Sequence, residues 1–276
     1  MSAVRFRHER MRIVSLFLFA AVLIVAGFAA TWWMRPVTPP QAPQSLAVPL
    51  PEPCRDVAFE GRTHIVCELD PAAHDIRIVH EDVNGKPFGS LLAFDAEMAG
   101  QGNTPLLSMN AGMYHKDLSP VGILVDDGRE KTPLNLDDGE GNFFMKPNGV
   151  FMVGRDGRAA VMESSVYAQT LPDTLYATQS GPMLVIDGKI HPRFEPDGTS
   201  RYIRNGVGID MQGRVVVAIS RKPVSLGSFA RLFRDELGCR NALFLDGAIS
   251  TLTSAGKVVI GGKHPAGPIL TVLEKR

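Results

Sequence analysis

The stretch CRNALFLDGAIST, residues 239–251, decides how the fold is interpreted. Its apolar run from Ala242 to Leu245 predicts a strand that is buried on both faces. Asp246 and Gly247 end the run, so the carboxylate is expected where a buried strand reaches the surface of its sheet. Gly247 permits a positive φ and a close approach of the backbone to a ligand. Because Asp-Gly is also a common turn pair, an ordinary turn is the alternative interpretation of these two residues.

The residues before this strand predict a helix. Between Ser225 and Gly238, apolar residues recur at helical spacing while charged residues fill the opposite face. We expect this helix to pack on the sheet and to belong to the core. A second helix is predicted from Leu91 to Ala99, with Ser90 as its N-cap and Gly100 as its end.

The remaining pattern is that of an antiparallel sheet. Residues 63–69 and 75–81 alternate partially between apolar and polar, as strands do. Four dipeptides that end in glycine each separate two apolar runs, as tight hairpin turns would: Asp127-Gly128, Asp156-Gly157, Asp187-Gly188 and Gln212-Gly213. The predicted class is therefore α+β, a mostly antiparallel mixed β-sheet with a few packed helices.

The N-terminus predicts a membrane anchor, residues 1–34. Four arginines precede an apolar run from Ile13 to Met34 that no charge interrupts, and about 20 apolar residues suffice to cross a bilayer. The arginines place the N-terminus in the cytoplasm by the positive-inside rule. A cleaved signal peptide is the alternative. Residues 35–53 contain seven prolines and predict a stiff linker, so residues 54–276 form the predicted extracytoplasmic domain.

The composition of the chain argues against some classes of binding partner. The formal net charge is zero and basic residues cluster only at the N-terminus, which argues against a nucleic-acid partner. The three cysteines lack the spacing of metal ligands. Cys54 and Cys67 are close enough in sequence to bridge a hairpin in an oxidising compartment. Cys239 is expected to be a small buried hydrophobe.

An acidic loop begins at residue 137. Asp137, Asp138 and Glu140 could bind calcium through oxygen ligands, but they lack the spacing of a known calcium loop. A solvated acidic loop is the preferred interpretation, and we expect neither a metal nor a cofactor. Glu140 is also a weak candidate for a second catalytic carboxylate.

The rest of this loop, up to residue 151, mixes aromatic and polar groups. Phe143 and Phe144 lie close to Lys146 and Asn148 in the sequence. A solvated loop and a sugar-contacting surface explain this composition equally well, because stacking faces and hydrogen-bonding edges suit a sugar.

Two arginines further along are candidate phosphate ligands. Arg204 lies close to two glycines, which give it room to reach a ligand, and Arg221 follows the apolar run 215–220. The planar guanidinium offers two parallel charge-assisted hydrogen bonds to phosphate. For Arg221, a plain surface position is the alternative.

Five clusters, in this order, resemble the phosphodiester glycosidase family. They are NAGMYH (110–115), SGPMLVIDGK (180–189), RNGVGID (204–210), FARLFRDELGC (229–239) and ALFLDGAIS (242–250). The resemblance covers roughly residues 60–272 and is greatest to an uncharacterised bacterial branch. It implies a glycosidase that acts on sugar phosphodiesters. With the anchor, it implies a single-pass protein of the bacterial inner membrane whose domain lies in the periplasm or outside the cell.

The resemblance also implies site residues. Asn110 and Gly112 match the family's first strand end, although Ala111 stands where glycine is usual. The last motif continues with Ala248-Ile249 instead of two glycines, which narrows the space beside the preceding aspartate. The candidate site residues are Asp246, Arg204 and Asn110 for catalysis, and Gly112, Lys146, Asn148, Ser180, Gly181, Arg221, Gly247 and Ser250 for substrate binding.

The chemistry of a sugar phosphodiester fits these residues. Its leaving group is already a stable anion, so the site needs positive charge on the phosphate and one group at the anomeric carbon. Arg204 suits the first role as preorganised charge, and Asp246 suits the second as nucleophile or general base. The predicted function is hydrolysis of a sugar-1-phosphodiester in envelope or exported polysaccharide. The alternative is a tethered, non-catalytic glycan-binding scaffold.

Overall fold

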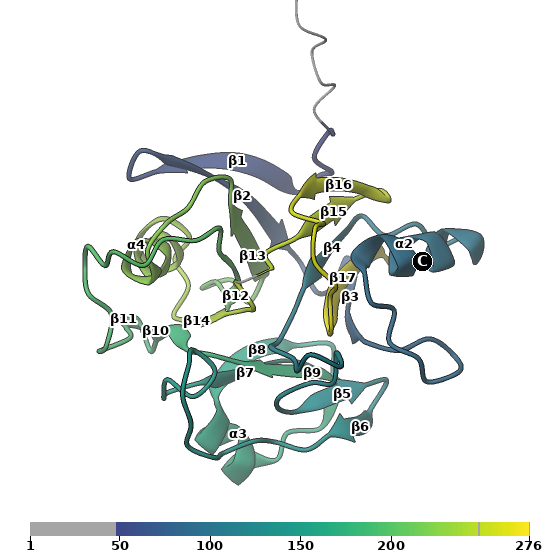
Figure 1. Cartoon of the computed structure of the whole chain (residues 1–276), viewed down its shortest axis with the longest axis horizontal. Helices are drawn as coiled ribbons and strands as arrows, with labels where there is room; N and C mark the ends of the chain where they lie inside the picture. The colour runs from purple at the N-terminus through teal and green to yellow at the C-terminus, as the bar shows by residue number, and fades with distance from the viewer. Residues whose placement is uncertain (1–47, 248, 276) are drawn as a thin grey trace, which may run out of the picture. The chain divides into compact units, whose positions relative to one another are not determined.

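The computed structural model describes residues 48–247 and 249–275 (Figure 1). The predicted anchor and most of the predicted linker lie outside these residues. Among the described residues, no helix is both long enough and apolar enough to cross a bilayer. The predicted α+β class with mostly antiparallel strands is confirmed: the described strands form three sheets, and every strand pairing described is antiparallel.

One of the three described sheets has seven strands, and the other two have five strands each. The first sheet has the order β1 (Cys54–Phe59), β2 (Arg62–Leu69), β13 (Val215–Ser220), β12 (Asn205–Ile209), β14 (Asn241–Phe244), β10 (Met183–Ile186), β11 (Lys189–Ile190). The second has the order β16 (Lys257–Ile260), β15 (Leu252–Ser254), β4 (Leu107–Asn110), β17 (Ile269–Glu274), β3 (His74–Val79). The third has the order β6 (Arg129–Thr132), β5 (Leu124–Asp126), β9 (Thr174–Ser180), β7 (Gly149–Gly154), β8 (Ala159–Glu163).

The four predicted hairpin turns are present. They join β5 to β6, β7 to β8, β10 to β11, and β12 to β13, all antiparallel neighbours. Asp127 and Asp187 have positive φ values of 49° and 47°, and the glycine that follows each is also positive. Two consecutive positive φ values are what a type I′ hairpin turn requires, which explains the choice of Asp-Gly.

Within residues 48–275, three short α-helices pack on the sheets: α2 (Leu91–Gly100), α3 (Ser164–Thr170) and α4 (Leu226–Arg231). The Ser90 hydroxyl accepts a hydrogen bond from the Ala93 amide, so the predicted cap of α2 is confirmed. The single helix predicted from Ser225 to Gly238 is instead α4 followed by a π-helical turn, η1 (Leu232–Glu236). Its apolar face packs against the seven-stranded sheet, as predicted, with Phe229, Leu232 and Phe233 fully buried and Leu226 partly buried.

The main core lies where the three sheets meet. Strand β14 supplies Leu243 to this core, while its neighbours Ala242 and Phe244 pack on the other face, beneath α4. All three are at most 1% exposed, so the predicted strand with two buried faces is confirmed. A disulfide between Cys54 and Cys67 joins β1 to β2, and Cys239 is buried. Because its backbone is buried on both sides, β14 holds the residue that follows it, Leu245, and then Asp246 in fixed positions.

Helix α2 buries a carboxyl group, Asp95, which is 2% exposed. The Ser108 hydroxyl donates to its Oδ1 atom at 2.6 Å, and Oδ2 has no hydrogen-bond partner among the described residues. Burial, the largest effect, raises the pKa of Asp95. The folded state therefore favours the protonated acid.

Because the Asp95 carboxyl group is buried, the folding stability of the protein should depend on pH. A carboxyl group whose pKa is raised on folding contributes stability below its unfolded pKa and loses it as pH rises through the folded value. We expect the Asp95→Asn variant to lose less stability than the wild type between pH 4 and pH 8, because Asn carries no charge to bury. Urea unfolding across this range measures the slope. Asp187→Asn at an exposed turn is the control, and equal slopes for all three proteins would contradict the assignment.

Candidate functional site

Four strand ends from the three sheets lie around one site. Strand β4 ends at Asn110, β9 ends at Ser180, β12 begins at Asn205, and β14 ends just before Leu245 and Asp246. The Asp246 amide donates to the Ala111 carbonyl at 3.2 Å. The end of β14 is thereby joined to the end of β4, a strand of a different sheet.

The Asn110 side chain holds this junction together. Its Nδ2 atom donates to the Asp246 carbonyl at 2.7 Å, and its Oδ1 atom accepts from the Thr251 amide at 2.8 Å. The Asn205 side chain donates to the Asn110 carbonyl at 2.9 Å. Ser250, through its hydroxyl, donates to the Ile203 carbonyl at 2.8 Å. The structure therefore places Asn110 and Ser250 as supports of the Asp246 loop.

Asp246 lines a cavity of about 420 Å³. The same cavity is lined by Arg204, so the two residues with the clearest predicted roles face one space. Tyr114 lies close by: burial first, and then the negative charge of Asp246, raise the pKa of Tyr114 to about 12. The phenol is thus protonated at neutral pH. The other residues lining the cavity are Met113, Asn142, Ser200, Tyr202, Phe244 and Gly247.

Arg204 is buried although it is charged. It is 2% exposed, and its Nε and Nη2 atoms donate to the carbonyls of Val224 and Ser200, each at 2.9 Å. The guanidinium carbon lies 5.2 Å from the ring centre of Phe244 and 5.6 Å from that of Tyr202, within cation–π range. Burial lowers the pKa of Arg204 to about 10, so the side chain stays charged at neutral pH.

The charge of Arg204 is poorly compensated by the protein. None of the ion pairs formed by the described residues includes it. A buried charge without a counter-ion costs free energy. A guanidinium has five N–H donors, and the two carbonyls use two of them. An anionic ligand in the cavity would supply the missing charge.

Two glycines in the site allow close packing. A Cβ atom on Gly247 would lie 2.4 Å from the Phe244 ring, and one on Gly112 would lie 2.3 Å from the Gln179 carbonyl oxygen. Gly247 is not among the glycines with positive φ. Its role is therefore to leave room for the Phe244 ring beside Arg204, which differs from the predicted freedom in φ.

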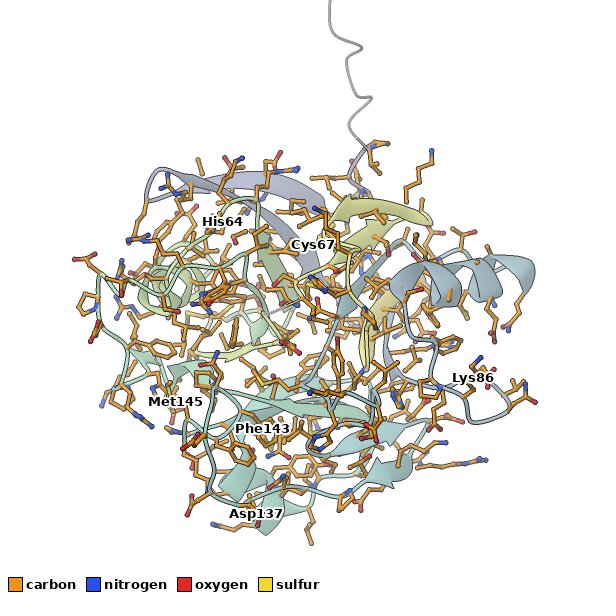
Figure 2. All side chains as sticks on the ribbon, in the orientation of Figure 1. His64, Cys67, Lys86, Asp137, Phe143 and Met145 are labelled. Atoms are coloured by element: carbon orange, nitrogen blue, oxygen red, sulfur yellow. A yellow bond between two sulfur atoms is a disulfide. The ribbon has the colours of Figure 1, made fainter. Side chains whose placement is uncertain are left out.

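The loop after residue 137 contacts this region only in part. Lys146 donates to the Leu136 carbonyl and to Asp138, both at 2.7 Å, while Asn148 donates to the Phe143 carbonyl at 3.0 Å. Of these residues, none lines the cavity. Phe143 is 4% exposed and lies inside the molecule, whereas Asp137 lies at its edge (Figure 2). The aromatic character of Phe143 is therefore explained by its packing inside the molecule and does not require contact with a sugar.

The remaining predicted substrate-binding residues do not line the Asp246 cavity, apart from Gly247. Ser180 is fully buried, and its hydroxyl has no hydrogen-bond partner among the described residues. Gly181 forms a cis peptide bond with Pro182. Arg221 lies away from the cavity, where it forms an ion pair with Asp56 at 2.7 Å. The structure thus brings Asp246, Arg204 and Gly247 together at the cavity and leaves Arg221 outside it.

The residues at the site that were not predicted from the sequence include four polar ones. Tyr202, Ser200 and Asn142 line the cavity, and Asn205 supports it. Asn205 carried a usable signal, because an amide at the start of an apolar strand needs partners when it is buried. The other three lie in loops, where the sequence pattern says little about direction. No group of three or more His, Cys, Asp or Glu residues suited to a metal occurs in the described part of the chain.

The support from Asn110 is testable. We expect Asn110→Ala to reduce kcat about 10- to 100-fold with little change in KM, because the Asp246 loop loses its anchor while the cavity wall is kept. Unfolding should become easier by about 1–3 kcal/mol, since buried backbone partners lose their hydrogen bonds. Asn241→Ala is the matched control: its side chain accepts from the Asp187 amide at 2.8 Å, away from the cavity. Equal kcat losses in both variants would contradict a specific role.

Sequence comparisons find a matching family and a similar protein. The sequence profile of the phosphodiester glycosidases matches residues 103–271. The uncharacterized protein YigE of Escherichia coli strain K12 is 33% identical over 207 residues, which cover 75% of this chain and 80% of that protein.

Solved structures show the same fold at low sequence identity. The zebrafish N-acetylglucosamine-1-phosphodiester alpha-N-acetylglucosaminidase catalytic domain, auto-inhibited by its pro-peptide, has a TM-score of 0.57 at 14% identity, with 83% of this chain and 85% of that one covered. A hypothetical protein from Synechocystis has a TM-score of 0.56 at 13% identity and 80% and 61% coverage. Because the family profile spans more than half of the residues, the chain belongs to the phosphodiester glycosidase family, whose members are glycosidases that act on phosphodiester sugars.

Proposed function

We propose that this protein is a membrane-anchored, extracytoplasmic hydrolase that cleaves the glycosidic bond of a sugar-1-phosphodiester in envelope or exported polysaccharide. The observation that carries the proposal is the placement of Asp246 and Arg204 in the wall of one cavity. The mainly apolar run from Ile13 to Met34, which contains no charged residue, supports the anchor, and the Cys54–Cys67 disulfide supports an oxidising compartment.

The reaction breaks the bond between the anomeric carbon and the phosphate oxygen. The electron pair leaves with the phosphate, which becomes a phosphomonoester, and an oxygen from water ends on the sugar. Arg204 binds the phosphate and stabilises the charge that grows on it as the bond breaks. Asp246 acts on the other side of the bond, as the nucleophile or as the base that activates water.

The leaving group explains why one carboxylate can suffice. An ordinary glycosidase protonates its leaving oxygen with a second carboxylic acid. Glu140, the candidate for that role, is exposed and does not line the cavity. A departing phosphomonoester is already a stable anion, so a buried arginine can replace the acid as the group that assists departure.

The test is turnover of a panel of aryl sugar-1-phosphodiesters by the purified full chain. The panel starts with α-N-acetylglucosamine, the sugar in the name of the zebrafish protein, and continues with other hexoses. We expect release of the aryl phosphate from at least one member. Absence of turnover across the panel, with glycan binding retained in the same preparation, would replace the proposal with a tethered glycan-binding module.

A further inference from the structure

Tyr202 is an exposed aromatic residue in the wall of the Asp246 cavity. Its exposed fraction is 57%, whereas Phe244, the other ring beside Arg204, is 1% exposed. The guanidinium carbon of Arg204 lies 5.6 Å from the ring centre of Tyr202 and 5.2 Å from that of Phe244. The charged group is thus in contact with one buried ring and one exposed ring, and all three side chains line the same cavity.

The backbone holds Tyr202 close to Arg204. The Tyr202 amide donates to the Val224 carbonyl at 3.2 Å, and the Tyr202 carbonyl accepts from the Val224 amide at 2.8 Å. The same Val224 carbonyl accepts from the Nε atom of Arg204 at 2.9 Å. Because side chains alternate along an extended chain, Tyr202 and Arg204 both reach the cavity, while Ile203 between them packs against the main core. One carbonyl group therefore fixes both the arginine side chain and the backbone that carries the exposed ring.

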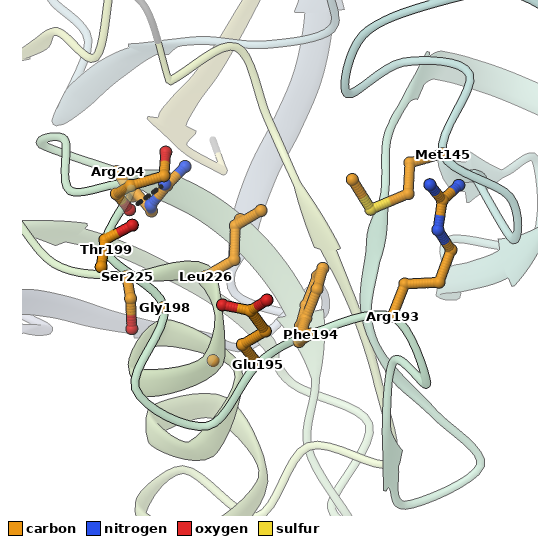
Figure 3. Close-up of a pocket in the computed structure, with 11 residues that line it drawn as sticks. Met145, Arg193, Phe194, Glu195, Gly198, Thr199, Arg204, Ser225 and Leu226 are labelled. Carbon is orange, nitrogen blue, oxygen red and sulfur yellow. Dashed lines mark hydrogen bonds between the residues drawn. The ribbon is translucent and has the colours of Figure 1, made fainter.

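The contacts of Arg204 stabilise its charge without neutralising it. Figure 3, a close-up of a neighbouring pocket that Arg204 also lines, shows its hydrogen bond to the Ser200 carbonyl. A carboxylate partner would neutralise the guanidinium and occupy its N–H donors. The face of an aromatic ring attracts a cation through its quadrupole and leaves those donors free. The two rings thus stabilise the buried charge while its remaining donors stay available to an anion.

We propose that Tyr202 is a positioning residue for Arg204: its ring takes the place of a counter-ion and keeps the guanidinium sheltered from water and oriented toward the phosphate. This inference rests on the proposed function, which assigns Arg204 to the phosphate. Tyr202 is the ring to test, because Phe244 belongs to the buried core beneath α4. A change at the exposed ring should leave the fold intact.

The first measurement compares Tyr202→Leu with Tyr202→Phe. Leucine keeps an apolar side chain but removes the ring, whereas phenylalanine keeps the ring and removes only the hydroxyl. We expect Tyr202→Leu to weaken the binding of inorganic phosphate by about tenfold, as the loss of a partly desolvated cation–π contact would. Tyr202→Phe should recover most of this affinity, and both variants should melt close to the wild-type temperature. Titration calorimetry of the purified full chain measures the affinity.

Two results of this titration would overturn the inference. One is equal phosphate affinity in Tyr202→Leu and the wild type, because the ring would then contribute nothing to Arg204. The other is a wild type that does not bind phosphate. A loss in Tyr202→Phe as large as that in Tyr202→Leu would assign the effect to the hydroxyl, and the ring would again have no role.

Turnover separates the proposed role from direct contact with the sugar. In Tyr202→Leu, the ratio of phosphodiester to simple aryl glycoside activity should fall by about tenfold, because only the phosphodiester depends on Arg204. If Tyr202 stacked on the sugar instead, both activities would fall together, and an unchanged ratio would overturn the role through Arg204. A wild type inactive on every sugar, with phosphate binding that Tyr202→Leu still weakens, would overturn the proposed function and leave the role of Tyr202 in place.

Discussion

Replacing Asp246 with asparagine should reduce kcat by about 10³-fold, within the range seen when a catalytic acid–base group is removed. Asparagine has nearly the same shape but is neither a nucleophile nor a base. The hydrogen bonds from Asn110 and to Ala111 use the backbone of Asp246, so the loop should keep its conformation. The loss should therefore appear in kcat, while the melting temperature and KM change little.

The measurement is steady-state hydrolysis of the best aryl sugar-1-phosphodiester, together with thermal unfolding of the same samples. Asp138→Asn is the control, because this carboxylate pairs with Lys146 outside the cavity. Its kcat should stay within about twofold of the wild type. Full activity of Asp246→Asn would remove Asp246 from the mechanism.

Replacing Arg204 with lysine should lower kcat/KM for phosphodiesters by about 10²- to 10³-fold, as expected for the loss of a preorganised charge at a transition state. Lysine keeps the charge but cannot donate to the Val224 and Ser200 carbonyls and to a phosphate from one planar group. Activity on an aryl glycoside without phosphate should change far less, since Arg204 is assigned to the phosphate alone.

Arg221→Lys is the matched control for this arginine. Arg221 is also predicted from the sequence as a phosphate ligand, but it pairs with Asp56 outside the cavity. Its replacement should change kcat/KM by less than about threefold, because exposed ion pairs contribute little. The ratio of phosphodiester to simple glycoside activity is the decisive quantity. An unchanged ratio in Arg204→Lys would show that the phosphate is bound elsewhere.

The parts of the fold that the sequence predicted are those with a local physical cause. Asp-Gly turns, the Ser90 cap and the buried strand before Asp246 each depend on a few neighbouring residues, and all three are present. The division into three sheets depends on long-range pairing, such as that of β4 with β15 and β17. No residue within β4 specifies those partners.

The site residues also differ in whether their roles depend on neighbouring residues or on distant ones. Asp246 and Arg204 were predicted from the resemblance to the family, together with the position of Asp246 at the end of a buried strand and of Arg204 close to two glycines. Asn110 was predicted as catalytic, yet its side chain is occupied by the Asp246 carbonyl and the Thr251 amide. Only the fold reveals such a role, because the partners lie 136 and 141 residues away.

The most direct test of the account is to find which bond breaks. Hydrolysis of a sugar-1-phosphodiester in water enriched in ¹⁸O, followed by mass spectrometry of both products, locates the new oxygen. Because Asp246 is assigned to the anomeric carbon and Arg204 only to the phosphate, the label should appear in the free sugar and not in the phosphomonoester. Label in the phosphate would show attack at phosphorus, and the protein would then be a phosphodiesterase and not a glycosidase.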